Sequence, residues 1–195
     1  MAMLDTKVSL QPEKWVSNYA DQMYKYLLIR VKYAEVAEDL VQETFMAALG
    51  SMDKFSGNAS EKTWLYSIMK FKLMDYYRKH YKNTPAESIP EEQFEDVYFN
   101  QAEGSHFRKE HTPKAWHSDV EKAMEEKEFN GVLTKCLEKV PTKAANVFNL
   151  KYLEDQDSKE ICNLLDISEA NLWTLMHRAK LMLRECFEKN WFVTA

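Results

Sequence analysis

The sequence predicts an all-α protein in which two small helical domains are joined by a flexible acidic linker. Glycine and proline interrupt helices, and the chain holds only 4 glycines and 5 prolines among its 195 residues. Apolar residues recur at three- and four-residue steps in both halves of the chain, which is the period of an amphipathic helix. Prolines and acidic residues gather between these halves, over residues 84–128. The expected domains are therefore residues 12–83 and 129–190.

Residues 12–33 are expected to form a first helix that packs against the next one. From Val36 onward the apolar residues fall on one stripe of a second, acidic helix: Leu40, Val41, Phe45, Ala48, Leu49 and Met52. The polar residues fall on the other side and face water or a partner: Glu35, Glu38, Asp39, Gln42 and Glu43. Core packing explains the first helix fully.

A short loop over residues 55–60 leads to a third helix, which runs from Lys62 to Asn83. Asn58 with Glu61 forms a possible capping box at its start, and Ser60 is the alternative cap. This helix carries the cations Lys62, Lys70, Lys72, Arg78, Lys79 and Lys82, interleaved with the aromatic residues Trp64, Tyr66, Phe71, Tyr76, Tyr77 and Tyr81. Cations attract phosphates and ring faces stack on unpaired bases, so the helix is a candidate site for single-stranded nucleic acid. Periodicity alone also allows a solvated face with aromatic core residues.

The linker, residues 84–128, carries most of the negative charge. Of the net charge of −5, residues 1–83 contribute +2, residues 84–130 contribute −7, and residues 131–195 contribute 0. Few phosphates are neutralised by such a chain, so weak binding to free duplex DNA is expected. Apolar residues within the linker indicate docking to another surface: Phe94, Val97, Tyr98, Phe99, Phe107 and Trp116.

The C-terminal part has the plan of a helix-turn-helix. Residues 129–153 predict two helices broken at Pro141, and a short helix over Lys159–Leu165 follows, capped by Asp157 with Glu160 or by Ser158. Ser168 is the expected N-cap of a long helix that reaches about Lys189. A short helix, a tight turn and a longer helix form this motif. The exposed face of the long helix is predicted to carry Asn171, Thr174 and Arg178, flanked by His177, Lys180 and Arg184.

Catalytic and metal sites are not expected. We find no glycine-rich phosphate loop, no nucleophile–base pattern and no carboxylate–histidine cluster, so the chain is predicted to be neither an enzyme nor a cofactor-binding protein. His106, His111 and His117 lack regular ligand spacing, which disfavours a metal site. Cys136, Cys162 and Cys186 lack C-x-x-C spacing and are odd in number, so they are interpreted as reduced thiols in or near the core. The start of the chain lacks a secretory signal and no apolar run approaches the ~20 residues that span a bilayer, so a cytoplasmic location without membrane insertion is expected.

Two sequence strings resemble a known family. Ala37-Glu38-Asp39-Leu40-Val41-Gln42-Glu43-Thr44-Phe45, followed by Thr63-Trp64-Leu65-Tyr66, resembles region 2 of bacterial sigma factors, in particular the extracytoplasmic-function (ECF) group. Ile167-Ser168-Glu169-Ala170-Asn171, followed by His177-Arg178-Ala179-Lys180 and Leu183-Arg184, resembles sigma region 4. The resemblance implies an alternative sigma factor, which binds core RNA polymerase, directs it to promoters through −10 and −35 elements and promotes DNA melting.

The resemblance also implies roles for individual residues. The residues expected to contact the coiled coil of the polymerase β′ subunit are Asp39, Gln42, Glu43 and Met46. Those expected at the −10 element are Ser51, Phe55, Asn58, Lys62, Lys70, Phe71, Arg78 and Lys79. Those expected at the −35 element are Ser168, Glu169, Asn171, Thr174, His177, Arg178 and Lys180. Trp64 is expected in the core, the linker is expected to follow the RNA exit channel, and an anti-sigma factor is an expected partner.

Two positions depart from the family pattern. Phe71 stands where many relatives have Asn, so a polar contact is missing or replaced by stacking. Asp166 stands where relatives have Gly in the turn, and Asp tolerates a positive φ better than most residues. The rival interpretations are a stand-alone helix-turn-helix regulator with an N-terminal sensing domain and a helical adaptor protein.

Overall fold

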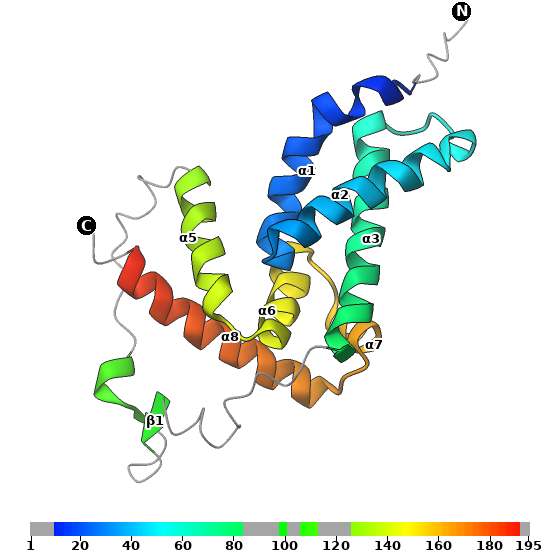
Figure 1. Ribbon diagram of the computed structural model, residues 1–195. Coiled ribbons are helices and arrows are strands. Elements are labelled where there is room, and N and C mark those ends of the chain that lie inside the picture. Colours follow the sequence, from blue (N-terminus) through cyan, green and yellow to red (C-terminus); the bar gives the residue numbers. More distant parts are fainter. Residues whose placement is uncertain (1–9, 84–97, 101–105, 113–125, 192–195) are drawn as a thin grey trace, which may run out of the picture. The chain divides into compact units, whose positions relative to one another are not determined.

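The computed structural model describes residues 10–83, 98–100, 106–112 and 126–191, and these are mainly α-helical (Figure 1). The chain divides into two compact units, residues 1–80 and 81–195, which are taken one at a time. The all-α fold class is confirmed. None of the helices in the described ranges is long and apolar enough to cross a membrane.

The first unit is built from helices α1 (Trp15–Val31), α2 (Ala34–Leu49) and α3 (Glu61–Asn83). Short 3-10 turns precede α1 (η1, Pro12–Lys14) and follow α2 (η2, Met52–Lys54). Lys32 ends α1 with a φ of 68°, and its N–H donates to the Leu28 carbonyl at 3.1 Å. This tight reversal lets α2 fold back on α1, as the sequence predicts.

The core of the first unit draws on one stripe from each helix. Its fully buried members include Trp15, Met23 and Leu27 from α1, Ala37 and Ala48 from α2, and Leu65, Met69, Leu73 and Tyr77 from α3. The α3 residues recur every four positions, so they form one ridge along the helix. At the end of that ridge the Tyr77 hydroxyl donates to the Arg30 carbonyl at 3.1 Å, which satisfies two polar groups inside the core.

Two local predictions in this unit need correction. The N-cap of α3 is Ser60, whose Oγ accepts from the Thr63 N–H at 3.1 Å, so the alternative was right and the Asn58 capping box was wrong. Glu61 does not reach back to Asn58 because its carboxylate binds donors on α1 instead. Leu49 was expected in the core but is 48% exposed, because α2 ends there and Gly50 turns the chain away.

The second unit contains α5 (Glu126–Lys139), α6 (Thr142–Phe148), the π-helical turn η6 (Asn149–Leu153), α7 (Ser158–Leu165) and α8 (Glu169–Asn190). The break at Pro141 is confirmed, since that residue is the N-cap of α6. Asp157 and Glu160 form the predicted capping box of α7, and Ser168 caps α8. Asp166 ends α7 with a φ of 57°, so the turn is made by an Asp in the left-handed conformation, which Asp tolerates better than most residues.

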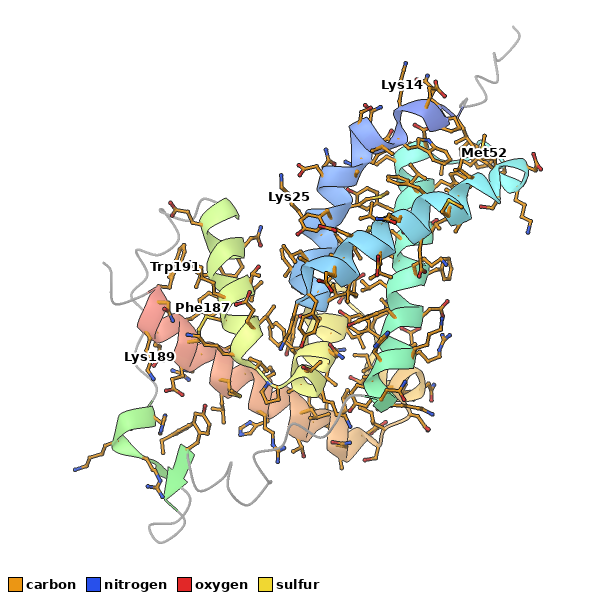
Figure 2. All side chains as sticks on the ribbon, in the orientation of Figure 1. Lys14, Lys25, Met52, Phe187, Lys189 and Trp191 are labelled. Atoms are coloured by element: carbon orange, nitrogen blue, oxygen red, sulfur yellow. A yellow bond between two sulfur atoms is a disulfide. The ribbon has the colours of Figure 1, made fainter. Side chains whose placement is uncertain are left out.

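The core of the second unit centres on α8. Leu172, Met176, Ala179 and Leu183 are buried on its inner face, against residues of α5, α6 and α7. At the far end of α8, Phe187 and Trp191 (labelled in Figure 2) enclose Phe129 of α5, with ring centroids 5.6 and 6.5 Å from it.

A disulfide joins Cys136 of α5 to Cys186 of α8, so the prediction that these two thiols are reduced was wrong. Their Cα atoms lie 5.7 Å apart, within the range that a disulfide spans. Both residues are buried, as expected, and Cys162 is the remaining free thiol. The pair was missed because 50 residues separate the partners and only the packing of α5 on α8 brings them together.

Part of the linker has regular structure. Strand β1 (Phe99–Asn100) pairs antiparallel with β2 (His106–Phe107), and a 3-10 turn, η4 (Lys109–His111), follows. The expectation of a docking residue in the linker holds for Tyr98, which is 7% exposed and whose hydroxyl donates to Glu185 Oε2 on α8 at 3.1 Å. Phe94, Val97 and Trp116 lie outside the described residues.

Candidate polymerase and nucleic-acid interfaces

The outer face of α2 carries the residues predicted to contact the polymerase. Asp39, Gln42, Glu43 and Met46 are all exposed, and their spacing places them on one side of the helix. Leu40, Val41 and Thr44 are buried on the opposite side and fix the orientation of the helix. Met46, 69% exposed, adds an apolar contact point to this acidic and amide-bearing face.

Glu43 also pairs within the unit, at 3.2 Å from the Lys72 Nζ on α3. Its side chain is 58% exposed, so solvent screens the pair and leaves it worth little. Glu43 therefore remains able to exchange Lys72 for a cation on a partner.

A groove of about 430 Å³ lies beside this face, between α1 and α2. It is lined by Val16, Ala20, Asp21, Tyr24, Glu38, Val41, Gln42 and Phe45. Gln42 thus belongs both to the exposed face and to the groove. The α1 residues were missed from sequence because the helix was assigned to core packing only. Exposed polar residues such as Asp21 on that amphipathic helix were the available signal.

The loop between α2 and α3 holds three of the predicted −10 residues in different environments. The Ser51 hydroxyl donates to the Ala47 carbonyl at 2.7 Å, so it closes the end of α2. The Phe55 ring packs against Trp64, with centroids 5.1 Å apart, and forms the base of the loop. Asn58 is exposed, next to Gly57, whose φ of 79° turns the chain. Trp64 is half-buried among rings, close to the expected core role.

Outside the core ridge of α3, cations and aromatic rings form parallel rows. Lys62, Tyr66, Lys70 and Arg78 share one row at multiples of four residues, and Lys62 Nζ lies 5.5 Å above the Tyr66 ring. Partial burial raises the pKa of the Tyr66 hydroxyl, so this ring stays neutral at physiological pH. Arg78 pairs with Asp75 at 2.7 Å on the exposed surface.

Phe71 and Lys79 share the next row of α3, farther from the core. Phe71 is 74% exposed, more than any other large apolar side chain in the described ranges. An exposed ring on a cationic helix is a poor structural element but a good stacking platform for an unpaired base.

The seven predicted −35 residues divide into two groups on α8. At about 100° per residue, Asn171, Thr174 and Arg178 lie on one side of the helix. The Ser168 hydroxyl accepts from the Asn171 N–H at 3.2 Å, so Ser168 acts as the helix cap. Thr174 Oγ1 donates to the Ala170 carbonyl at 3.1 Å.

Glu169, His177 and Lys180 project from a different side of α8 than Arg178 does. That side also holds Trp173, which is 56% exposed and was not singled out from sequence. Lys180 Nζ lies 5.2 Å above the ring of Tyr152, itself 50% exposed. The signal for Trp173 was its position off the apolar stripe that Leu172 and Met176 define.

The linker hairpin contacts the same side of α8 as Arg178, two turns farther along. His111 Nδ1 lies 3.5 Å from Glu185 Oε2, which also receives the Tyr98 hydroxyl. Burial alone raises the pKa of Glu185, but hydrogen bonds from Lys189 and Tyr98 and the nearby charges of Lys189 and His111 outweigh it and lower that pKa. Glu185 therefore stays ionised and holds the hairpin at neutral pH.

Both helical parts of the chain match a known protein family. The model of sigma-70 region 2 matches residues 15–83, and the model of sigma-70 region 4 matches residues 131–183. A probable RNA polymerase sigma factor of Haemophilus influenzae is 30% identical to the chain, over 86% of this chain and 85% of that protein. The chain belongs to the sigma-70 family of RNA polymerase sigma factors.

A further relative by sequence is also a sigma factor. The ECF RNA polymerase sigma factor SigM of Bacillus subtilis is 26% identical over 88% of this chain and 91% of SigM. The sigma factor RpoE of Bartonella quintana, solved in complex with the anti-sigma factor NepR, aligns with a TM-score of 0.42 and 16% identity over 91% of this chain and 97% of RpoE. The sigma factor is a non-enzymatic initiation subunit that directs polymerase to promoters, and the stand-alone regulator is not favoured.

Proposed function

We propose that this sigma factor divides its work between three segments: residues 12–83 bind core polymerase and the −10 element, residues 129–190 bind the −35 element, and residues 84–128 connect them. The exposed face of Asp39, Gln42, Glu43 and Met46 carries the proposal, because it offers acceptors for Arg and Lys on a partner coiled coil. The groove beside it extends this face onto α1. The protein works in the cytoplasm, where the polymerase is.

The loop between α2 and α3, together with α3 itself, opens the promoter. Asn58 and Phe55 contact a base of the non-template strand after it has left the stack. Lys62, Lys70, Arg78 and Lys79 hold the phosphates on either side, and Phe71 stacks on a neighbouring base. The Ser51 hydroxyl donates to the Ala47 carbonyl, which fixes its position, and its lone pairs accept a hydrogen bond from a base at the −10 element.

The −35 element is read by α8. Asn171, Thr174 and Arg178 lie near its N-terminal half and contact base edges in the major groove. Ser168 and Glu169 stand at the start of the helix, and His177 and Lys180 contact the phosphate backbone from the neighbouring side.

The acidic linker follows the RNA exit channel of the polymerase and acts as a temporary RNA mimic. Most of it lies outside the described residues. Deletion of residues 86–125 is expected to leave polymerase binding intact and to lower the yield of productive transcripts. An anti-sigma factor that covers the two reading surfaces keeps the protein inactive until it is needed.

The decisive experiment combines the purified chain with core polymerase and a genomic promoter library, and sequences the transcripts. We expect promoter-specific transcripts with core polymerase and weak binding of the chain alone to duplex DNA at physiological salt. Tight binding of the isolated chain to a palindromic duplex, without any response to core polymerase, contradicts the proposal and supports an independent regulator.

A further inference from the structure

Glu61, the first residue of α3, directs its carboxylate away from its own helix and toward the start of α1. Oε1 accepts from the Gln11 N–H at 2.6 Å and from the Trp15 Nε1–H at 2.7 Å. Oε2 accepts from the Tyr19 hydroxyl at 3.1 Å. Ser60 already caps α3, so these contacts are additional to helix capping. One carboxylate thus joins segments that lie more than 40 residues apart in sequence.

The charge of Glu61 is stabilised where it stands. Burial alone raises the pKa of this carboxyl, but the hydrogen bonds from Gln11, Trp15 and Tyr19 and the charge of Lys14 outweigh it and lower the pKa. Lys14 stands at the start of α1 (Figure 2). The carboxylate is therefore ionised throughout the neutral range and makes charge-assisted hydrogen bonds, which are stronger than neutral ones.

Trp15, whose N–H donates to Glu61, belongs to a series of packed aromatic rings that includes residues of α2, α3 and the loop between them. Its indole is 1% exposed and packs against Phe45 of α2 and Trp64 of α3, with centroids 6.3 and 6.1 Å away. Trp64 in turn packs on Phe55 at 5.1 Å. Because buried rings interlock, the orientation of Trp15 sets the place of Trp64, and Trp64 sets the place of Phe55 at the base of the loop.

We propose that Glu61 is a positioning residue for capture of the −10 element, which acts by fixing Trp15 and, through Trp64, the loop that begins at Phe55. This inference rests on the proposed function of the loop. Glu61 itself does not contact DNA. Its effect is on the geometry with which Phe55 and Asn58 meet an unpaired base, and a small displacement of such a site has a large cost.

The test uses the full chain assembled with core polymerase and measures two affinities. One is the affinity of each variant for core polymerase. The other is the affinity of the assembled enzyme for a fluorescent single-stranded oligonucleotide that carries the −10 sequence found by transcript mapping. Glu61→Ala is expected to weaken oligonucleotide binding by about 10- to 100-fold, with polymerase affinity unchanged. Glu61→Gln keeps one carbonyl acceptor for Trp15 and is expected to remain within about threefold of wild type.

Two further variants define the route. Trp15→Phe keeps an aromatic side chain but removes the N–H together with one ring of the indole, so it is expected to weaken oligonucleotide binding as Glu61→Ala does, and the double variant is expected to be no weaker than Glu61→Ala. Glu13→Gln, at an exposed site in η1, is the matched control and is expected to bind like wild type.

Each result decides the matter. Wild-type oligonucleotide binding by Glu61→Ala overturns the proposal. A parallel loss of polymerase affinity also overturns it, because that loss indicates general unfolding of the unit. Fully additive effects of Glu61→Ala and Trp15→Phe exclude the route through Trp15. If the wild-type assembly itself does not bind the oligonucleotide, the proposed function of the loop fails instead.

Discussion

The long helices α3 and α8 both carry candidate nucleic-acid contacts, but they acquire these surfaces in different ways. The reading face of α8 is defined locally: Ser168 starts the helix, Leu172 and Met176 bury one side, and the other side is left for Asn171 and Arg178. The surface around α3 is composite. The base of its loop packs through Trp64 on Trp15 of α1, which Glu61 binds, and the neighbouring α2 carries the proposed polymerase contacts. A surface on a single helix can be predicted from the helical period of the sequence. A surface built from several helices depends on how those helices pack.

The largest expected effect is a loss of polymerase binding when the charges on the exposed face of α2 are reversed. Asp39→Lys with Glu43→Lys places two cations where a basic partner surface is expected, and such repulsion costs about 2–5 kcal/mol of binding free energy. Capture of core polymerase in a pull-down should be abolished. Glu13→Lys with Glu128→Lys changes the net charge equally at exposed sites elsewhere and should bind normally. Unchanged capture by the α2 variant removes the docking assignment.

The next prediction concerns the local surface. Asn171→Ala with Arg178→Ala should lower transcription from promoters that need the −35 element, with a loss of about 1–3 kcal/mol for each base contact removed. Polymerase capture should not change. Lys180→Ala, on the other side of α8, should weaken DNA binding modestly and equally for all sequences, because its proposed contact is a phosphate. Sequence-specific loss from Lys180→Ala instead identifies the Trp173 side as the reading face.

A third prediction compares the stability of the two units. The Cys136–Cys186 disulfide should stabilise the second unit by about 2–4 kcal/mol, since it closes a long loop in the unfolded chain. Thermal unfolding followed by circular dichroism should shift downward with dithiothreitol in the wild type, but not in Cys136→Ser. Cys162→Ser is the control and should keep the shift. Labelling of three thiols in the native, untreated protein contradicts the pairing.

The smallest effect tests the exposed aromatic of α3. Phe71→Ala should cost about 1–3 kcal/mol of affinity for single-stranded −10 DNA, because a stacking platform is lost, and Phe71→Tyr should keep most of it. The folded stability should hardly change, since the ring is 74% exposed. The measurement is the same oligonucleotide titration as for Glu61. A loss of stability without any loss of DNA affinity refutes the stacking role.

The same distinction explains what the sequence could predict. Helix caps and breaks depend on residues that are close in sequence, so they could be predicted from the sequence pattern. This holds for the capping box of Asp157 with Glu160, for the N-cap Ser168 and for the break at Pro141. The exposed face of α2 followed from helical period in the same way. The family itself was recognisable from two short strings.

What the sequence could not supply depended on distant partners. The sequence allowed a capping box between Asn58 and Glu61, but in the structure the Glu61 carboxylate accepts a hydrogen bond from Trp15 of α1 instead. The disulfide between Cys136 and Cys186 forms because α5 and α8, which are far apart in sequence, pack together. The groove likewise exists only because α1 packs beside α2. The exposure of Trp173, on the side of α8 that also carries His177 and Lys180, was likewise not predicted.

The position of the cysteines has a consequence for how the protein responds to its surroundings. All three of them, Cys136, Cys162 and Cys186, belong to the half that is expected to read the upstream promoter element, and the other half has none. Thiol oxidants and reductants can therefore change the covalent state of one domain only. Two preparations of identical sequence, one made with reductant and one without, will differ in that domain alone.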